Sequence, residues 1–231
     1  MSVMDAIGSR TGRTPGAADD LFSLEGFRSR ALRRLPFAAE RDTGDHILNP
    51  DLGPYAKWTG DPREAAVLIP VLARPLLQGL EPGEASVLFT LRTPHLTAHG
   101  GQIAFPGGKI DPEDGSPEAA ALREAQEEIG LDPSAVEPFA RLSPYLTGSG
   151  YRITPVVGLV HELPPLTANP GEVADIFDVP LGFLMRPENH QRQSREWQGR
   201  PRYFYAMPYE TRYIWGVTAG IVRSLYETVY A

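Results

Sequence analysis

The sequence predicts an α/β domain in which a mixed β-sheet is sandwiched between α-helices. Segments rich in apolar and β-branched residues, typical of strands, occur on both sides of an amphipathic helix predicted at residues 116–129, and a second amphipathic stretch follows at 218–230. Strands before and after one helix, with a further helix at the end, indicate a sheet that is covered on both faces. With 231 residues, 42% of them hydrophobic, the chain can form one substantial domain with a buried core.

The N-terminal quarter of the chain is expected to lie outside this domain. Residues 1–20 are rich in Gly, Ser, Ala and Thr and lack periodicity, so we expect a disordered tail. Residues 21–62 are expected to form an N-terminal arm, with a short basic helix within 21–39 and an Asp-, Gly- and Pro-rich linker at 46–62. The apolar positions of the helix are Phe22, Leu24, Phe27, Leu32 and Leu35. Its arginines form either a solvated face or a surface that binds an anion or a partner; they are Arg28, Arg30, Arg33 and Arg34.

The domain itself is expected to span residues 63–231. Two strands at 65–73 and 85–92 are separated by a Gly-containing turn, and a short third strand is expected at 103–105. After the helix, strands are expected at 141–146 and 152–161, and 173–184 has mixed character. A hairpin that turns at Gly199 precedes the closing helix, whose apolar face is formed by Ile221, Val222, Leu225 and Val229.

Composition and charge exclude several classes of function. The formal net charge of −7 argues against broad, sequence-independent binding of nucleic acid. The absence of cysteine excludes disulfide frameworks, zinc–thiolate sites and thiol nucleophiles, and it fits a reducing compartment. The longest apolar run, residues 65–73, is far shorter than the ~20 residues of a membrane helix, and residues 1–20 lack the apolar core of a signal peptide. We therefore expect a cytoplasmic protein without membrane or nucleic-acid partners.

The helix at residues 116–129 has well-marked ends and two distinct faces. Ser116 is suited to cap its first turn, Pro117 to occupy the first helical position, and Gly130 to end it. One face, expected to pack on the core, is formed by Leu122, Ala125 and Ile129. The opposite face brings together three carboxylates at spacing i, i+3, i+4, those of Glu124, Glu127 and Glu128.

Three neighbouring carboxylates indicate a site for a hard divalent cation. They repel one another unless they are solvated or neutralised, and Mg²⁺ prefers oxygen ligands while it keeps several waters. Gly107 and Gly108, just before the helix, permit close approach of the backbone to a metal and to phosphates. The stretch R-E-A-Q-E-E taken alone is also that of an ordinary solvated helix, so the interpretation depends on the spacing of the whole segment.

The segment from residue 107 to residue 131 resembles the Nudix box, G-x5-E-x7-R-E-U-x-E-E-x-G-U, in which U is a bulky aliphatic residue. Residues 123–131 match position by position, although Ala125 is smaller than the usual aliphatic residue. Asp114 stands at the place of the first carboxylate, and one extra residue separates it from Arg123. The resemblance implies a Nudix fold and metal-dependent hydrolysis of a diphosphate bond, with Mg²⁺ or Mn²⁺.

A second motif is similar to one branch of this family. Residues 88–108, L-F-T-L-R-T-P-H-L-T-A-H-G-G-Q-I-A-F-P-G-G, resemble the signature of the coenzyme A diphosphatases, as do residues 213–222. The signature has a basic residue where this chain has Thr97. The resemblance implies cleavage of coenzyme A or its thioesters to 3′,5′-ADP and the 4′-phosphopantetheine part. Two alternatives stay open: hydrolysis of another nucleoside diphosphate derivative such as ADP-ribose or a dinucleotide, and a non-catalytic module that senses a ligand.

The family resemblance also implies roles for individual residues. Metal ligands are expected at Glu124, Glu127, Glu128 and the backbone carbonyl of Gly108. Arg123 is expected to orient these carboxylates by ion pairing, with Asp114 within its reach. The general base is expected among Glu127 and Glu128 on the helix and Glu172 on a later loop, where a glutamate is otherwise simply solvated.

The substrate is expected to be a small molecule bound by residues of both motifs. The predicted substrate-binding residues are Arg92, His99, Gln102, Phe105 and Lys109. Three aromatic residues are candidates either to stack on adenine or to pack in the core: Phe105, Tyr145 and Tyr151. Dimer interfaces are common among Nudix enzymes, so a homodimer is one expectation that the resemblance implies.

Overall fold

The structure, a computed structural model, describes residues 21–35, 41–50, 61–73, 76, 83–96, 99–197 and 199–231. The predicted tail at 1–20, most of the predicted linker and Thr97 lie outside the described residues. Within them, the chain forms a nine-stranded sheet, a three-stranded sheet and four α-helices. No helix in this described part has the length and apolar character needed to cross a membrane.

The large sheet is mixed, as predicted. Its central strands β2 (Arg63–Leu72) and β8 (Tyr151–Val160) run parallel, whereas β3 (Ser86–Arg92) pairs antiparallel with β9 (Val173–Pro180). The strand order is β1-β7-β8-β2-β3-β4, with β5 beside β2, β6 beside β8 and β9 beside β3. The remaining strands are β1 (Thr43–Gly44), β4 (Ile103–Ala104), β5 (Gly107–Lys109), β6 (Glu137–Arg141) and β7 (Tyr145–Leu146).

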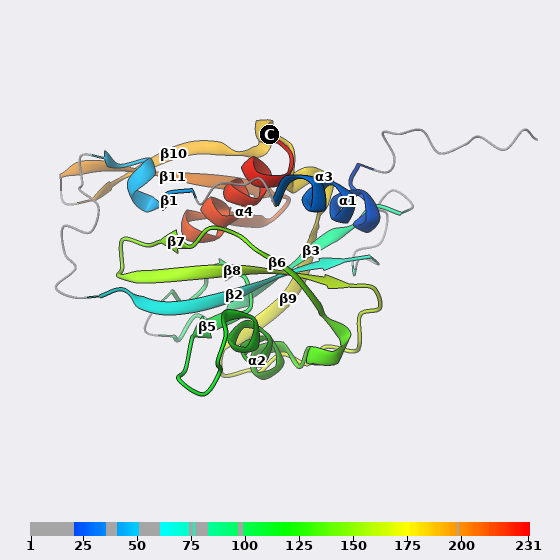
Figure 1. Ribbon diagram of the computed structural model, residues 1–231. Coiled ribbons are helices and arrows are strands. Elements are labelled where there is room, and N and C mark those ends of the chain that lie inside the picture. The colour runs from blue at the N-terminus through cyan, green and yellow to red at the C-terminus, as the bar shows by residue number, and fades with distance from the viewer. Residues whose placement is uncertain are drawn as a thin grey trace, which may run out of the picture.

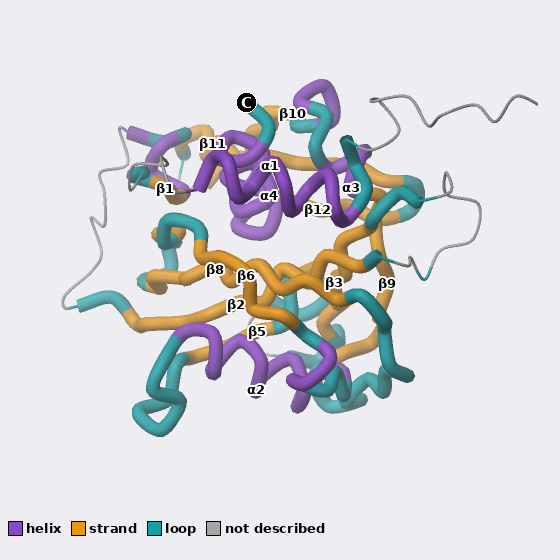
Figure 2. The backbone as a smooth tube through the Cα atoms, turned by 45° about the vertical axis from the view of Figure 1, so that its right-hand side comes forward, coloured by secondary structure: helices purple, strands orange, loops and turns teal. Residues whose placement is uncertain are grey.

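Helices cover both faces of the large sheet, which confirms the predicted sandwich. Helix α2 (Pro117–Ile129) lies against one face, and α1 (Leu24–Arg34) and α4 (Gly216–Val229) lie together against the other (Figures 1 and 2). The small sheet packs on α4 and consists of β10 (Gln191–Trp197), β11 (Arg200–Tyr209) and β12 (Arg212–Trp215). The short helices are η2 (Asp45–Ile47), η4 (Pro133–Ala135), α3 (Leu181–Leu184) and η5 (Pro187–Asn189).

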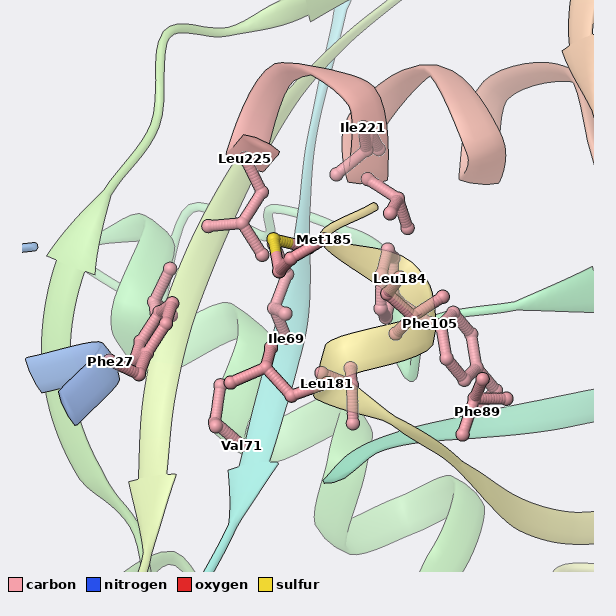
Figure 3. Packing of buried hydrophobic residues seen from close by; sticks show 14 of the residues in the cluster. Phe27, Ile69, Val71, Phe89, Phe105, Leu181, Leu184, Met185, Ile221 and Leu225 are labelled. Carbon is pink, nitrogen blue, oxygen red and sulfur yellow. The ribbon is translucent and has the colours of Figure 1, made fainter. Parts of the chain in front are cut away.

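Two apolar clusters, one on each face of the large sheet, hold these layers together. Successive side chains of a strand point to opposite faces. Leu68 and Leu72 of β2 therefore join the cluster beneath α2, whereas Ile69 and Val71 join the cluster shared with α1 and α4. Figure 3 shows the second cluster, in which Phe27 of α1 and Leu225 of α4 lie with Ile69 and Val71 of β2. Removal of this apolar surface from water makes the largest favourable contribution to the stability of the sandwich.

The N-terminal helix packs onto the domain and does not stand apart from it. Ser23 caps α1, because its Oγ accepts a hydrogen bond from the N–H of Gly26 at 3.0 Å. Phe27 is fully buried in the cluster shared with α4. One predicted apolar position is wrong: Leu32 is 54% exposed, and Ala31 is the buried residue of that turn. The helix therefore belongs to the same core as the predicted domain.

The basic side of α1 also contacts the rest of the chain. Arg28 pairs with Glu137 at 3.6 Å, and the guanidinium of Arg30 lies 5.1 Å from the ring centroid of Tyr230. Cations over aromatic rings are attracted by the ring quadrupole. At least these two arginines therefore take part in packing within the chain.

The prediction of a linker is wrong for residues 46–50. Asp45, just before them, accepts a hydrogen bond from Arg202 of β11 at 2.7 Å. Asn49 is buried and exchanges two hydrogen bonds with the backbone of Tyr203, at 2.9 and 2.7 Å. A buried amide with both of its polar atoms bonded fixes a segment in place, so this stretch is docked on the small sheet.

Other boundaries differ from the sequence prediction for local reasons. The strand predicted at 141–146 is two strands, β6 and β7, because Pro144 lacks a backbone N–H for the sheet. The mixed segment at 173–184 is strand β9 followed by α3, and the predicted hairpin is confirmed as β10 and β11. Strands β5 and β12 are not predicted, since a Gly-Gly-Lys stretch and a four-residue strand offer no clear alternation.

Candidate active site

Helix α2 has the ends that the sequence predicts. The Oγ of Ser116 accepts a hydrogen bond from the N–H of Ala119 at 3.1 Å, and Gly130 ends the helix in the left-handed conformation at φ 68°. Of its predicted apolar face, Ala125 and Ile129 are fully buried against the large sheet, and Leu122 is partly buried. These ends and this face place the carboxylate-bearing side of the helix along strand β5.

The diglycine of β5 lies directly against two of the carboxylates. A Cβ atom on Gly108 would lie 2.6 Å from both carboxylate oxygens of Glu124. Only glycine at position 108 therefore leaves room for the Glu124 side chain in this position. The N–H of Gly107 donates a hydrogen bond to Oε2 of Glu128 at 3.3 Å. Gly107 has φ 153°, and a Cβ there would lie 2.4 Å from the carbonyl oxygen of Ala66 on β2. Close approach of backbone and carboxylates thus explains both glycines.

Arg123 joins the helix to the loop that precedes it. Its Nε and Nη2 donate to the two oxygens of Asp114 at 2.8 and 3.0 Å, a two-point pairing that suits the planar guanidinium. Its Nη1 contacts Glu124 at 3.0 Å and Glu127 at 3.4 Å, and its Nη2 also reaches the carbonyl of Lys109. The hydrogen bonds from Arg123 hold the pKa of Asp114 below its usual value. Ion pairing of Arg123 with Asp114 and the helix carboxylates is what the sequence predicts.

Glu128 is the most buried of the three helix carboxylates. Its side chain is 2% exposed and lies 3.3 Å from Nη1 of Arg92 on β3. Burial raises the pKa of Glu128 to about 7, opposed by Arg92 and by the hydrogen bond from Gly107. The neighbouring carboxylates of Glu172 and Glu124 raise the pKa of Glu128 further. Glu128 is therefore a buried carboxyl held between the guanidinium of Arg92 and the backbone of Gly107.

Glu172 lies on the loop before β9, close to the carboxylates of α2. It contributes to raising the pKa of both Glu124 and Glu128, for which burial is the larger cause, so its charge acts on both side chains. The loop is held by two backbone bonds, from Thr93 N–H to the Glu172 carbonyl at 2.9 Å and from Glu172 N–H to the Asn169 carbonyl at 3.0 Å. The structure therefore brings together Glu172 and the two less exposed helix carboxylates.

Glu127 has a different setting from its neighbours. Its side chain is 58% exposed, and its carboxylate lies 3.4 Å from Nη1 of Arg123. Glu124 and Glu128, by contrast, lie against the diglycine backbone. The three glutamates that share one helix face by spacing thus divide into two that line the site and one at its rim.

The second motif forms a hairpin beside Glu128. The N–H of Arg92 donates to the carbonyl of Gln102 at 3.0 Å, which places the two ends of the motif side by side. His99 adopts φ 59°, and its Nδ1 lies 2.9 Å from Oε1 of Gln102. Arg92 therefore lies within the carboxylate cluster, while His99 and Gln102 hold the turn of the hairpin together. The side chain of Lys109 is exposed next to the site, and its carbonyl is bound by Arg123.

Phe105 is a correction to the predicted substrate-binding residues. Its side chain is 4% exposed and stacks on Phe89, with ring centroids 4.7 Å apart. Figure 3 shows the two rings together in the core, close to Leu184. A ring packed in this way has no free face for a substrate. Tyr145 is likewise buried, at 7% exposed, and donates to Asp45.

The sequence misses the residues that hold the Glu172 loop. Thr93 Oγ1 donates to the carbonyl of Gly171 at 3.3 Å, and Asn169 N–H donates to the carbonyl of Glu128 at 2.8 Å, so the loop is tied both to β3 and to the end of α2. The Asn-Pro-Gly stretch at residues 169–171 indicates a turn, but no local signal shows what that turn contacts.

The buried pairing of Arg123 allows a prediction about stability. We expect Arg123→Ala to lower the free energy of unfolding by about 2 kcal/mol, because the Asp114 carboxylate, 6% exposed, would lose its two-point partner. Arg123→Lys is expected to recover less than half of this loss, since an ammonium cannot reproduce the fork. Urea unfolding monitored by circular dichroism measures both.

Arg152→Ala is the matched control, since Arg152 makes an equally short two-contact pair with Glu64 but is 50% exposed. Exposed pairs contribute roughly 0–1 kcal/mol. Equal losses for Arg123→Ala and Arg152→Ala would show that burial of the Asp114 pair contributes nothing.

The carboxylates fit a divalent cation by charge and by chemistry. Glu124, Glu128 and the nearby Glu172 supply the oxygen donors that a hard divalent cation prefers. Burial is the main cause that raises the pKa of Glu124 and Glu128, and neighbouring carboxylates add to it. In the described part of the chain, no three acidic or histidine side chains are arranged as a ready-made metal cage. Arg92 and Arg123 lie beside these carboxylates and supply positive charge there.

The sandwich fold and the diglycine loop against a helix of carboxylates define an enzyme of the class that hydrolyses diphosphate bonds. The chain belongs to the Nudix family: the NUDIX domain model matches residues 74–198. Nudix hydrolases generally use divalent metal ions and act on small-molecule substrates.

Relatives of this chain carry the same family name. The Uncharacterized Nudix hydrolase NudL of Yersinia pestis (strain Pestoides F) is 41% identical over 167 residues, which cover 72% of this chain and 80% of that protein. The protein of the same name from Yersinia pseudotuberculosis serotype O:1b (strain IP 31758) gives the same values. Among solved structures, the Nudix hydrolase RenU from M. smegmatis is 27% identical, with a TM-score of 0.39, and the match covers 52% of this chain and 72% of that one.

Proposed function

We propose that this protein hydrolyses the diphosphate bond of coenzyme A or its thioesters, giving 3′,5′-ADP and the 4′-phosphopantetheine part. The observation on which this rests is the contact between Arg92 and Glu128 at 3.3 Å. Arg92 belongs to the motif that resembles the coenzyme A diphosphatases, and Glu128 belongs to the Nudix box. The two motifs, which are separate in the sequence, therefore contribute residues that contact each other in the site.

The helix and the diglycine loop supply the residues that would hold the metal. Glu124 and Glu128 are the principal ligands in this proposal, with the carbonyl of Gly108 beside them and Glu127 at the rim. A bound Mg²⁺ or Mn²⁺ would polarise the phosphate oxygens and lower the pKa of a water molecule. Arg123 orients the carboxylate of Glu124 through its anchor on Asp114.

Glu172 is the proposed general base. Its carboxylate lies near enough to Glu124 and Glu128 to contribute to the raised pKa of both, on a loop tied by backbone hydrogen bonds to β3 and to the end of α2. Its side chain is only partly buried, so water can reach it. Glu127 is largely exposed and paired with Arg123, and Glu128 is engaged by Arg92 and Gly107, so both are less suited to take a proton from water.

Positive charge for the substrate diphosphate would come from Arg92 and Lys109. Arg92 is 23% exposed beside the carboxylates, and Lys109 is exposed at the end of β5. Guanidinium and ammonium groups bind phosphate oxygens strongly. His99 and Gln102 would act by shaping the hairpin that carries Arg92, since they contact each other at 2.9 Å.

Hydrolysis of another nucleoside diphosphate derivative, such as ADP-ribose, is the second candidate. It is favoured by Thr97, which stands where the coenzyme A diphosphatase signature has a basic residue. Without that basic residue, a further phosphate group of coenzyme A would have one contact fewer with the protein.

The first experiment is hydrolysis of coenzyme A with Mg²⁺, with Mn²⁺ and with a chelator, with ADP-ribose in parallel and the products separated by chromatography. Metal-dependent formation of 3′,5′-ADP supports the proposal. Turnover of ADP-ribose alone would keep the chemistry and reject coenzyme A as the substrate. Turnover of neither compound, with ligand binding retained, would favour the non-catalytic sensing module.

The pKa of Glu128 gives a prediction for metal binding. Burial raises this pKa to about 7, so below that pH the carboxyl holds a proton that a metal must displace. We expect the affinity for Mn²⁺ to fall by up to about tenfold per pH unit below pH 7. Electron paramagnetic resonance of free Mn²⁺ measures it, and an affinity that is constant between about pH 5.5 and 7 would contradict the assignment of Glu128 as a ligand.

A further inference from the structure

Strand β10 is a free edge of the small sheet. The order of that sheet is β10-β11-β12, so β10 pairs with β11 on one side and with no strand of the described residues on the other. It lies at the periphery of the molecule (Figure 1), and every residue of β10 except Gln193 is exposed. An edge of this kind presents a row of backbone N–H and C=O groups that can pair with another strand.

This edge lacks most of the features that commonly prevent such pairing. β10 spans seven residues, contains no proline, and keeps a continuous register with β11 from Gln191 to Trp197, without a bulge. Natural edge strands are often very short, or are interrupted by proline or by a bulge. Charged side chains are the protective feature that is present, those of Arg192, Arg195 and Glu196. Their effect on pairing depends on which charges a second strand brings opposite them.

The contacts of Tyr203 show which residues of β10 point their backbone groups outward. Tyr203 of β11 is the register partner of Ser194. Its N–H donates to Oδ1 of Asn49 at 2.7 Å, and its C=O accepts from Nδ2 of Asn49 at 2.9 Å, so both groups point away from β10. Two opposed residues of an antiparallel pair either bond to each other or both point away. The N–H and C=O of Ser194 therefore lie on the free edge, as do those of Arg192 and Glu196, two positions away on each side.

The sequence of β10 is self-complementary in charge about Ser194. When two copies of β10 pair antiparallel about a two-fold axis at Ser194, Arg192 lies opposite Glu196 of the second copy, and Glu196 lies opposite Arg192. Gln193 then lies opposite Arg195, so no like charges are directly opposed. Moving the axis by one residue would shift the pairing by two positions and remove both Arg–Glu pairs. Opposite charges across two strands stabilise their pairing, so the charges favour one register.

The side chains concerned are available to a second chain. Glu196 is exposed and forms no ion pair with any described residue. The guanidinium carbon of Arg192 lies 4.3 Å from the ring centroid of Tyr203, a contact that holds the side chain along the strands without neutralising its charge. Trp197 is 53% exposed and would lie opposite Gln191 of the second copy, so pairing also removes aromatic surface from water.

We propose that the free edge of β10 is the surface through which two copies of this chain associate, in the antiparallel register centred on Ser194. The small sheets of the two copies then form one continuous sheet across the two-fold axis. The small sheet packs on α4, whereas α2 covers the opposite face of the large sheet (Figures 1 and 2). The association therefore leaves the carboxylate site open and does not depend on the proposed function.

Sedimentation velocity of the full chain, at concentrations from about 1 to 300 µM, measures the association. A single strand edge is smaller than a standard interface, so we expect a dissociation constant of roughly 10–100 µM. Arg192→Glu and Glu196→Arg are each expected to weaken association roughly tenfold, because each change opposes like charges twice across the axis. Arg195→Glu is the matched control: it reverses the adjacent charge, which lies opposite an uncharged glutamine, and is expected to associate as the unchanged protein does.

Mixing the two weakened variants distinguishes this register from any other contact. In a pair formed by one chain of Arg192→Glu and one of Glu196→Arg, opposite charges again face each other at both positions. The mixture is therefore expected to associate as strongly as the unchanged protein.

Ser194→Pro tests the backbone pairing. The change removes an N–H from the free edge but none that bonds to β11, so it is expected to abolish association and to keep the melting temperature within a few degrees. A chain that stays monomeric at every concentration would overturn the proposal. So would a dimer that Ser194→Pro leaves intact, a dimer weakened equally by Arg195→Glu and Arg192→Glu, or two variants that do not associate when mixed.

Discussion

Glu128→Gln is expected to lower diphosphate hydrolysis by about a thousandfold, equivalent to ~4 kcal/mol of transition-state stabilisation. Glutamine keeps the shape of the side chain and an oxygen that can accept the hydrogen bond from Gly107, but it removes the charge that binds a cation. Turnover with Mg²⁺ and the affinity for Mn²⁺ are both measured, and both are expected to fall.

The fold is expected to tolerate this change. Burial disfavours the charged form of Glu128, as its raised pKa shows, so an uncharged amide at that place avoids a desolvation cost. The melting temperature of the metal-free variant is therefore expected to stay within a few degrees of that of the unchanged protein. Glu118→Gln, which removes the same charge from the first turn of the same helix, is the matched control. Unchanged turnover in Glu128→Gln would remove this residue from the metal site.

Local signals explain how much of the site the sequence predicts. The cap at Ser116, the left-handed Gly130 and the spacing of Glu124 and Glu128 act within one helix, so their geometry follows from the chain alone. The same holds for Arg123 and Glu127, which are one turn apart. The sheet and its helical layers follow from apolar segments long enough to show a period.

Contacts between distant segments are beyond such signals. Arg92 and Glu128 are 36 positions apart in the sequence. They meet only because α2, which carries Glu128, packs against the sheet that contains β3. Phe105 stands beside the diglycine in the sequence, yet its ring points into the core, because that direction is set by the pairing of β4 with β3. Leu32 and Ala31 are adjacent, and which of them is buried depends on where α1 meets α4.

Glu172→Gln is expected to lower kcat by about a hundredfold to a thousandfold, the range of general base catalysis, with little change in KM. The carboxylate of Glu172 lies near enough to Glu124 and Glu128 to contribute to the raised pKa of both, whereas Gln can hydrogen-bond a water molecule but cannot take its proton. Because Glu172 is not among the proposed ligands, the affinity for Mn²⁺ is expected to stay within a few-fold of that of the unchanged protein.

The comparison with two other variants decides which glutamate is the base. Glu162→Gln removes a charge from the same connection between β8 and β9, outside the site, and is expected to leave kcat unaltered. Glu127→Gln is expected to lower kcat less than Glu172→Gln, because Glu127 is 58% exposed and paired with Arg123. The reverse order, a large loss in Glu127→Gln and a small one in Glu172→Gln, would assign proton transfer to the helix and leave Glu172 as a solvated loop residue. A loss of Mn²⁺ binding in Glu172→Gln would instead make it a metal ligand, in keeping with its electrostatic influence on Glu124 and Glu128.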